Sequence, residues 1–176
     1  MKNNLVLIGF MGTGKTSLGK MLANKLGCAF VDLDQKIESD NGMSIPDIFK
    51  AHGEEHFRKL ERKAVEEVAQ RRGIVIATGG GTVKDPINVE LLKNNGVMIC
   101  LTTSVDELLI RTANRGERPV LDGRHQDHGD RRKAIEKLLE ERERFYAQAD
   151  YKIDTTDWSP LKLVDDIIKI MRSREP

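Results

Sequence analysis

Short apolar runs alternate along this chain with longer segments in which apolar residues recur every three or four positions. A continuous apolar run is typical of a strand buried on both faces, whereas recurrence at three and four positions is typical of a helix with one buried face. We expect strands at about residues 4–9, 29–32, 74–77, 97–101 and 150–154. We expect helices at about residues 15–26, 34–40, 45–51, 55–71, 86–94, 104–113, 132–147 and 159–173. This alternation predicts an α/β fold, with a parallel sheet covered by helices on both faces.

A phosphate-binding loop pattern lies between the first expected strand and the first expected helix. Residues Gly9 to Thr16 read glycine, four arbitrary residues, then Gly-Lys-Thr. Such a loop turns backbone N–H groups toward an anion, and the following helix adds the positive end of its dipole. Lys15 is expected to reach the β- and γ-phosphates, and the Thr16 hydroxyl is expected to bind Mg²⁺. The expected contacts to ATP in this region are Gly12, Thr13, Gly14, Lys15, Thr16 and Ser17.

Composition narrows the class of protein. The chain has 176 residues, which predicts a single domain over residues 1–176. A formal net charge of +1 gives no bulk attraction to nucleic acid or to a membrane surface. No apolar run approaches the roughly 18 residues of a membrane span, so we expect a cytoplasmic protein. Cys28 and Cys100 are expected to be reduced thiols.

Two carboxylates follow the second expected strand. Asp32 and Asp34 are two positions apart, so a strand through both would point them to the same face at the carboxyl edge of the sheet. We assign Asp32 mainly to the metal and Asp34 to a substrate hydroxyl. The alternative for Asp34 is a helix N-cap, which is compatible with a functional role.

Arg58 and Glu61 lie near the start of the helix expected over 55–71. Glu61 falls within the apolar stripe of that helix, and Arg58 is its neighbour at i−3. A carboxylate on a buried face needs a partner. Glu61 is therefore expected to orient Arg58 toward a buried anion, and the alternative is a purely structural ion pair.

Gly79, Gly80 and Gly81 follow the third expected strand. Three consecutive glycines are costly in backbone entropy, and they suit a place where a ligand lies against bare backbone. A flexible turn is the alternative.

Arg142 lies near the middle of the apolar arc of the helix expected over 132–147. An inward guanidinium calls for an anion, because it does not lose its proton. The spacing leaves open whether that anion belongs to the protein or to a substrate.

The segment at about residues 112–132 has few apolar residues and many arginines, which predicts a lid over a phosphate site or, alternatively, a surface loop. Pro119 stiffens the turn that carries Arg118, which suits an arginine facing the transferred phosphate.

The residues from His52 to His56 match a His-x-x-Glu-His zinc pattern. Gly53 falls where a continuous helix would be needed, and no third ligand follows. We therefore expect no zinc site there.

Taken together, these motifs resemble those of the shikimate kinases, from about Asn4 to Met171. The resemblance rests on Gly9 to Thr16, Asp32-x-Asp34, Phe57-Arg58-x-x-Glu61, Gly79-Gly80-Gly81, Arg118-Pro119-x-Leu121 and Arg142-x-x-x-Tyr146. It implies a five-stranded parallel sheet of order 2-3-1-4-5 with a mobile lid. It also implies transfer of the ATP γ-phosphate to the 3-hydroxyl of shikimate, with Mg²⁺, in the pathway to chorismate and the aromatic amino acids.

The resemblance also implies roles for individual residues. Arg58 and Arg142 would clamp the shikimate carboxylate, Asp34 would hold ring hydroxyls, and Gly80 would offer backbone N–H groups. Arg118 would close over the phosphates. The substrate-binding residues expected on this basis are Asp34, Arg58, Glu61, Gly79, Gly80, Gly81 and Arg142, within or facing a helical region at about 33–61. The expected catalytic residues are Lys15, Asp34 and Arg118, and the expected metal ligands are Thr16 and Asp32.

Arg111 would lie near adenine, together with the loop from Thr155 to Trp158. Thr78 and Gly79 stand where related folds carry a metal-binding aspartate, which favours Asp32 as the metal partner. Arg144 stands where many members of the family have proline, which affects the pose of Arg142. We expect a monomer that binds shikimate and ATP.

The sequence disfavours three alternatives to a shikimate kinase. A gluconate kinase would lack the pair Arg58 and Arg142 aimed at a carboxylate. A small GTPase would need an Asn-Lys-x-Asp motif, and the sequence has none. A catalytically dead nucleotide-binding module is disfavoured by Lys15, Asp34 and Arg118.

Overall fold

The computed structural model describes residues 3–113, 128–157 and 159–173, with the side chains of 128–130 excepted. Five strands form one parallel sheet of order β2-β3-β1-β4-β5, which confirms the predicted fold class and strand order. The strands are β1 (Asn4–Gly9), β2 (Phe30–Asp32), β3 (Val75–Ala77), β4 (Gly96–Thr102) and β5 (Tyr151–Asp154). The helices are α1 (Lys15–Leu26), α2 (Leu33–Asn41), α3 (Ile45–Ala69), η1 (Thr82–Lys84), α4 (Pro86–Asn94), α5 (Val105–Ala113), α7 (His128–Tyr146) and α8 (Pro160–Arg172).

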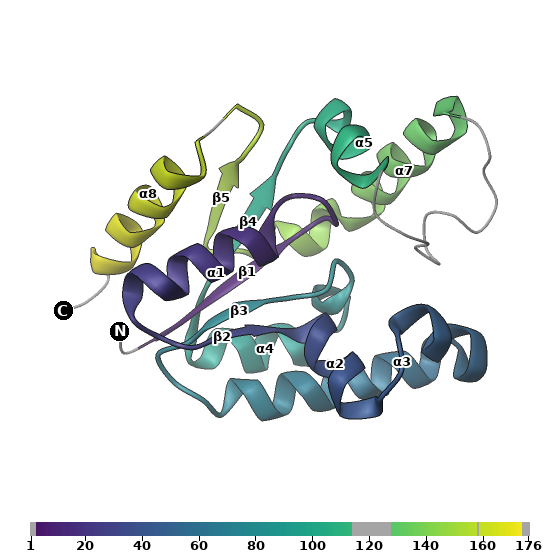
Figure 1. Cartoon of the computed structure of the whole chain (residues 1–176), viewed down its shortest axis with the longest axis horizontal. Coiled ribbons are helices and arrows are strands. Elements are labelled where there is room, and N and C mark those ends of the chain that lie inside the picture. The colour runs from purple at the N-terminus through teal and green to yellow at the C-terminus, as the bar shows by residue number, and fades with distance from the viewer. Residues whose placement is uncertain (1–2, 114–127, 158, 174–176) are drawn as a thin grey trace.

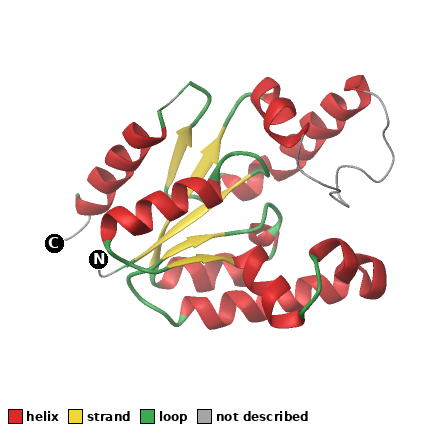
Figure 2. Cartoon of the chain, viewed as in Figure 1, coloured by secondary structure: helices red, strands yellow, loops and turns green. Residues whose placement is uncertain are grey.

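Helices cover both faces of the sheet (Figures 1 and 2). The alternation along β1 shows why: Leu5 and Leu7 belong to one buried cluster, and Val6 and Ile8 belong to the other. The first cluster is completed by α1 and α8, which lie together in Figure 1, and the second by α2, α3, α4, α5 and α7. All four side chains are fully buried, as expected for a central parallel strand.

The sheet order places the functional loops together. β1 is central, and the chain runs from β1 to β2 and β3 on one side of it and then crosses from β3 to β4 and β5 on the other side. In such a sheet, ligands bind at the carboxyl ends of the strands, where the strand order switches direction. The loops that follow β1, β2 and β3 all begin at this edge of the sheet.

Three elements differ from the sequence expectation. The helices expected at about 45–51 and 55–71 form one element, α3, with a kink at Gly53, whose φ of 79° and ψ of 174° are not helical. The short helix η1 was not expected. α7 begins at His128 rather than near 132.

Candidate active site

The loop between β1 and α1 has the backbone of an anion site. Gly12 and Gly14 have φ values of 85° and 92°, which side-chain-bearing residues rarely adopt. Gly14 is the N-cap of α1 and no side chain caps this helix end. The N–H groups of the first turn and the positive end of the helix dipole therefore favour a bound anion.

Lys15 and Thr16 follow this loop and point to different partners. The Lys15 ammonium donates to the carbonyl oxygens of Gly9 and Phe10, both at 2.8 Å, which holds the side chain back across the loop. The Thr16 hydroxyl donates to Asp32 Oδ2 at 2.6 Å. This second contact joins the loop after β1 to the end of β2.

The expected placement of Asp32 and Asp34 on one strand was wrong. β2 ends at Asp32, and Asp34 lies in the first turn of α2. Asp32 is the N-cap of that helix and accepts from the N–H groups of Asp34 at 3.1 Å and Gln35 at 3.3 Å. The N-cap that the sequence suggested for Asp34 thus belongs to Asp32. Both carboxylates nevertheless line the same cavity.

Glu61 is buried on the inward face of α3, as predicted, with an exposed fraction of 1%. Its Oε2 accepts from Arg58 Nη1 at 2.7 Å, and its Oε1 accepts from the Thr82 hydroxyl at 2.6 Å. Arg58 also binds Glu54, which is mostly exposed, at 3.0 Å. Burial lowers the pKa of Arg58, but Glu61 and Glu54 outweigh this and raise it overall. Arg58 is therefore a fixed cation held from two sides.

Arg142 enters the site from α7 with an exposed fraction of 5%. Its Nη1 donates to the Gly80 carbonyl at 3.3 Å, and its guanidinium lies 5.3 Å from the centroid of the Phe10 ring. The Tyr146 hydroxyl donates to the same carbonyl at 2.8 Å, and burial raises the pKa of Tyr146 to about 12. No carboxylate in the described ranges forms an ion pair with Arg142. The alternative of a protein carboxylate as partner thus has no support among these residues.

Each glycine of the loop after β3 faces a different charged group. A Cβ on Gly79 would lie 2.7 Å from Asp34 Oδ1, and one on Gly80 would lie 3.1 Å from Arg142 Nη1. A Cβ on Gly81 would lie 3.0 Å from both Nη1 and Nη2 of Arg58. None of the three has a positive φ, so the structure needs glycine here for space rather than for backbone conformation.

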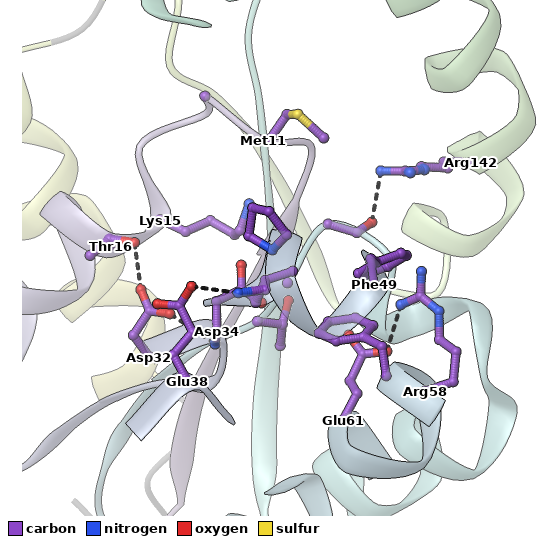
Figure 3. Close-up of a pocket in the computed structure, with 18 of the residues that line it drawn as sticks. Met11, Lys15, Thr16, Asp32, Asp34, Glu38, Phe49, Arg58, Glu61 and Arg142 are labelled. Atoms are coloured by element: carbon purple, nitrogen blue, oxygen red, sulfur yellow. Dashed lines mark hydrogen bonds and ion pairs between the residues drawn. The ribbon is translucent and has the colours of Figure 1, made fainter. Parts of the chain in front are cut away.

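One cavity of about 320 Å³ brings most of the predicted residues together (Figure 3). In this view Thr16, Lys15 and Asp32 lie at one end, and Arg58 and Arg142 lie at the other. The predicted residues that line it are Gly12, Gly14, Lys15, Thr16, Ser17, Asp32, Asp34, Arg58, Glu61, Gly79, Gly80, Gly81 and Arg142.

Two predicted residues lie outside this lining. The Thr13 side chain donates to the Phe10 carbonyl at 2.8 Å and stabilises the loop itself. Arg111, on α5, binds Glu107 at 2.8 Å and donates to the Thr155 carbonyl at 3.3 Å. Arg111 thus contacts the loop after β5 that the resemblance assigned to adenine. Arg118, Trp158 and residues 114–127 of the expected lid lie outside the described residues.

The sequence did not indicate an apolar wall of this cavity. That wall consists of Ile45, Pro46, Phe49 and Phe57, with the rings of Phe49 and Phe57 4.8 Å apart. Glu38 also lines the cavity and accepts from the Ile45 N–H at 2.9 Å. The apolar residues of this wall have the same spacing in the sequence as residues of a helix core. Only the packing of α2 against α3 identifies them as part of the cavity.

The side-chain atoms of this site that could bind a metal ion beside the phosphate loop are oxygens. The Thr16 hydroxyl and the Asp32 carboxylate are adjacent beside the phosphate loop, and Mg²⁺ prefers such ligands together with substrate phosphates. The rings of His52 and His56 lie 4.8 Å apart and are tilted by 44°, close to the kink at Gly53. Across the described ranges, no group of three or more His, Cys, Asp or Glu side chains could hold a metal ion.

No described helix has the length and apolar character needed to cross a membrane. Both cysteines are free thiols.

Comparison with known proteins gives the family. The family model described as Shikimate kinase matches residues 11–172. A shikimate kinase of Persephonella marina is 41% identical over 169 residues, covering 96% of this chain and 99% of the relative. A shikimate kinase of Caldanaerobacter subterraneus is 44% identical over 166 residues, covering 94% of each chain.

Solved structures agree. The shikimate kinase of Acinetobacter baumannii in complex with shikimate has a TM-score of 0.90 at 35% identity, covering 99% of this chain and 96% of that one. The enzyme of Bacteroides thetaiotaomicron has a TM-score of 0.89 at 33% identity, covering 98% and 99%. With a matching family model, relatives above 40% identity over nearly full length and the cavity described above, the chain belongs to the shikimate kinase family.

Proposed function

We propose that this chain transfers the γ-phosphate of ATP to the 3-hydroxyl of shikimate, giving shikimate 3-phosphate on the route to chorismate and the aromatic amino acids. One observation carries the proposal. The guanidinium groups of Arg58 and Arg142 both lie against the glycine loop, in the same cavity as Lys15 and Asp34. A cavity with two fixed cations at one end and a phosphate loop at the other suits an organic acid and a nucleotide.

Arg58 and Arg142 would bind the carboxylate of shikimate. Arg142 is buried and pairs with no carboxylate among the described side chains, so an anionic substrate would satisfy it. Arg58 is oriented by Glu61 and presents Nη1 and Nη2 toward Gly81. Charge-assisted hydrogen bonds of this kind are worth about 1.5–3 kcal/mol each.

Asp34 would hold the ring hydroxyls, including the attacked one. It lies beside Gly79, between the phosphate loop and the arginines. A carboxylate here would orient the attacking hydroxyl and accept its proton as the new O–P bond forms, while the bond from the γ-phosphorus to the β–γ bridging oxygen breaks and ADP leaves.

The triphosphate would lie in the loop between β1 and α1. Gly12 to Ser17 would supply N–H groups and the hydroxyl of Thr16. Lys15, now bonded to two loop carbonyls, would exchange those partners for phosphate oxygens and neutralise charge that builds up during transfer.

Thr16 and Asp32 would hold Mg²⁺, directly or through water. Their oxygen atoms are 2.6 Å apart at the phosphate loop, and neither is a nitrogen or sulfur ligand that would favour a softer metal. The ion would supply positive charge that offsets the negative charge of the phosphates during transfer.

Further assignments complete the proposal. Arg111, through its contact with the loop after β5, would border the adenine. Arg118, within a lid at about 112–132, would face the phosphates. Residues 1–176 would act as one cytoplasmic, monomeric kinase domain, with substrate binding centred on about 33–61.

A substrate panel tests the proposal. ADP release is measured with ATP and Mg²⁺ in the presence of shikimate, quinate, gluconate or nucleoside monophosphates. Turnover is expected with shikimate and not with gluconate or the nucleotides. Shikimate rates no higher than the blank would reject the function, and turnover of gluconate would assign the site to a different kinase.

A further inference from the structure

A continuous line of buried polar contacts runs from α4 to Arg58. Asn88 Nδ2 donates to the Thr82 carbonyl at 3.1 Å, and the Thr82 hydroxyl donates to Glu61 Oε1 at 2.6 Å. Glu61 Oε2 then accepts from Arg58 Nη1 at 2.7 Å. Asn88, Thr82 and Glu61 have exposed fractions of 1%, 0% and 1%. These three residues are therefore almost fully buried, and of the four only Glu61 and Arg58 border the cavity.

Thr82 itself does not line the cavity. It is the first residue of η1, and its N–H donates to the Gly79 carbonyl at 3.4 Å. A Cβ on Gly79 would meet both Thr82 Oγ1 at 3.1 Å and Glu61 Oε1 at 3.2 Å. Thr82 thus lies directly behind the glycine loop, with Glu61 between it and the substrate arginine.

The hydroxyl of Thr82 has a specific physical task. A buried carboxylate needs a hydrogen-bond donor for each oxygen, and Glu61 has an exposed fraction of only 1%. The Thr82 hydroxyl donates to Oε1 of Glu61, so only Oε2 accepts from Arg58. These two bonds fix the rotation of the carboxylate, and this rotation in turn fixes the plane of the Arg58 guanidinium. Without that donor, both oxygens would compete for Arg58 and turn its Nη1 and Nη2 edge away from Gly81.

We propose that Thr82 is a positioning residue that sets substrate affinity by fixing Glu61, and through it Arg58. The proposal rests on the proposed function, in which Arg58 binds the carboxylate of the substrate. It predicts an effect on shikimate binding that spares the nucleotide, because ATP would bind at the other end of the cavity.

Two substitutions separate this role from packing. Thr82→Val keeps the shape and removes the hydroxyl, whereas Thr82→Ser keeps the hydroxyl and removes the methyl group. Thr82→Val is expected to raise the KM for shikimate about fivefold or more, with kcat and the KM for ATP changed less than twofold. Thr82→Ser is expected to remain within about twofold of the wild type. Titration calorimetry with shikimate alone should give the same order of affinities.

The outcomes are distinct. An unchanged KM in Thr82→Val, or a loss in Thr82→Ser equal to that in Thr82→Val, would overturn the proposal. Wild-type protein that neither binds nor phosphorylates shikimate would reject the proposed function instead. Glu55→Gln, on the exposed side of α3, controls for charge changes on that helix. If circular dichroism shows that Thr82→Val does not fold, Thr82→Ala removes the same hydroxyl and takes its place.

Discussion

At the scale of single residues, Arg142 is a buried charge with no carboxylate partner among the described side chains. It is buried, it donates to one backbone carbonyl, and it lies near the face of one ring. Arg58, by contrast, has two carboxylate partners. The gain from a bound carboxylate should therefore be larger at Arg142.

Substitution of Arg142 should affect substrate affinity first. Arg142→Ala is expected to raise the KM for shikimate by about 10- to 100-fold, because a charge-assisted bond to the carboxylate is lost. Arg142→Lys keeps the charge but loses the planar fork, so an intermediate KM is expected. Steady-state kinetics measure both variants, and a KM that stays at the wild-type value in Arg142→Ala would contradict the clamp.

Substitutions of Asp32 and Asp34 should affect different steps: metal binding for Asp32 and proton transfer for Asp34. Asp34→Asn is expected to lower kcat by about 100-fold or more at saturating Mg²⁺, because the amide does not accept the proton of the hydroxyl. Asp32→Asn still caps α2 and should instead raise the Mg²⁺ concentration needed for half-maximal rate. Rates measured across a Mg²⁺ series distinguish the two, and a kcat for Asp34→Asn close to wild type would exclude a proton-accepting role.

At the scale of elements, the glycine loop after β3 explains how three charged groups approach so closely. Gly79, Gly80 and Gly81 each leave the space that one charged side chain occupies. The sequence predicted bare backbone for a ligand, and the structure adds that the bare backbone also admits the arginines and the aspartate.

A methyl group at Gly81 should disturb only the acid end of the cavity. It would lie 3.0 Å from both Nη atoms of Arg58. Gly81→Ala is therefore expected to raise the KM for shikimate about tenfold, with little change in the KM for ATP. Gly27→Ala, at the C-cap of α1 with no atom within 4 Å of its Cβ, should reduce stability without this kinetic change. An equal rise in the KM for shikimate and in the KM for ATP in Gly81→Ala would argue against a local contact with Arg58.

The elements also mark where local sequence patterns were sufficient. The helix α1 has the predicted bounds, because glycine loops and apolar spacing define both its ends. β2 ends at Asp32, as the expected strand at about 29–32 does. The expectation that Asp34 shares a strand face with Asp32 was wrong, because Asp32 caps α2 and Asp34 lies in that helix. Gly53 kinks α3 rather than ending it, since core contacts continue on both sides, at Ile48 and Phe57.

At the scale of the whole molecule, the two ends of the cavity come from distant parts of the chain. The phosphate end follows β1, whereas the acid end combines α3, the loop after β3 and α7. The two substrates should therefore stabilise the protein independently.

Thermal unfolding tests this independence. Ligands that bind the folded state raise Tm, by an amount that grows with the logarithm of ligand concentration above Kd. Lys15→Ala is expected to abolish the increase in Tm produced by MgATP and to retain the increase produced by shikimate. Arg142→Ala should show the opposite pattern. Loss of both responses in either variant would indicate a general defect of folding instead.

Stability at alkaline pH should depend on a buried thiol. Burial raises the pKa of Cys100 from 9.0 to about 11. A pKa raised in the folded state gives stability that is complete below the unfolded pKa and lost as pH rises to the folded pKa. The free energy of unfolding should thus fall by about 2 kcal/mol between roughly pH 9 and 11 through this group. Tyr146, with a pKa of about 12, adds a further loss above its ordinary value.

Urea unfolding at several pH values measures this loss. Cys100→Ala should be less stable at neutral pH because it leaves a cavity, but its stability should fall less between pH 9 and 11. Burial also raises the pKa of the half-buried Cys28, but less than that of Cys100, so Cys28→Ala should reduce the alkaline loss by less. Parallel curves for the wild type and Cys100→Ala would rule out the thiol as the source.

The sequence by itself determined the order of strands and helices and the phosphate loop. These depend on apolar periodicity and on glycines within a few residues of one another, and the family resemblance supplied the sheet order. The tertiary structure alone decided which polar groups meet. Arg142 reaches a carbonyl 62 positions away, and Thr82 reaches a carboxylate 21 positions away. Such contacts depend on how layers pack around the sheet, because burial and close approach are properties of the whole chain rather than of any local pattern.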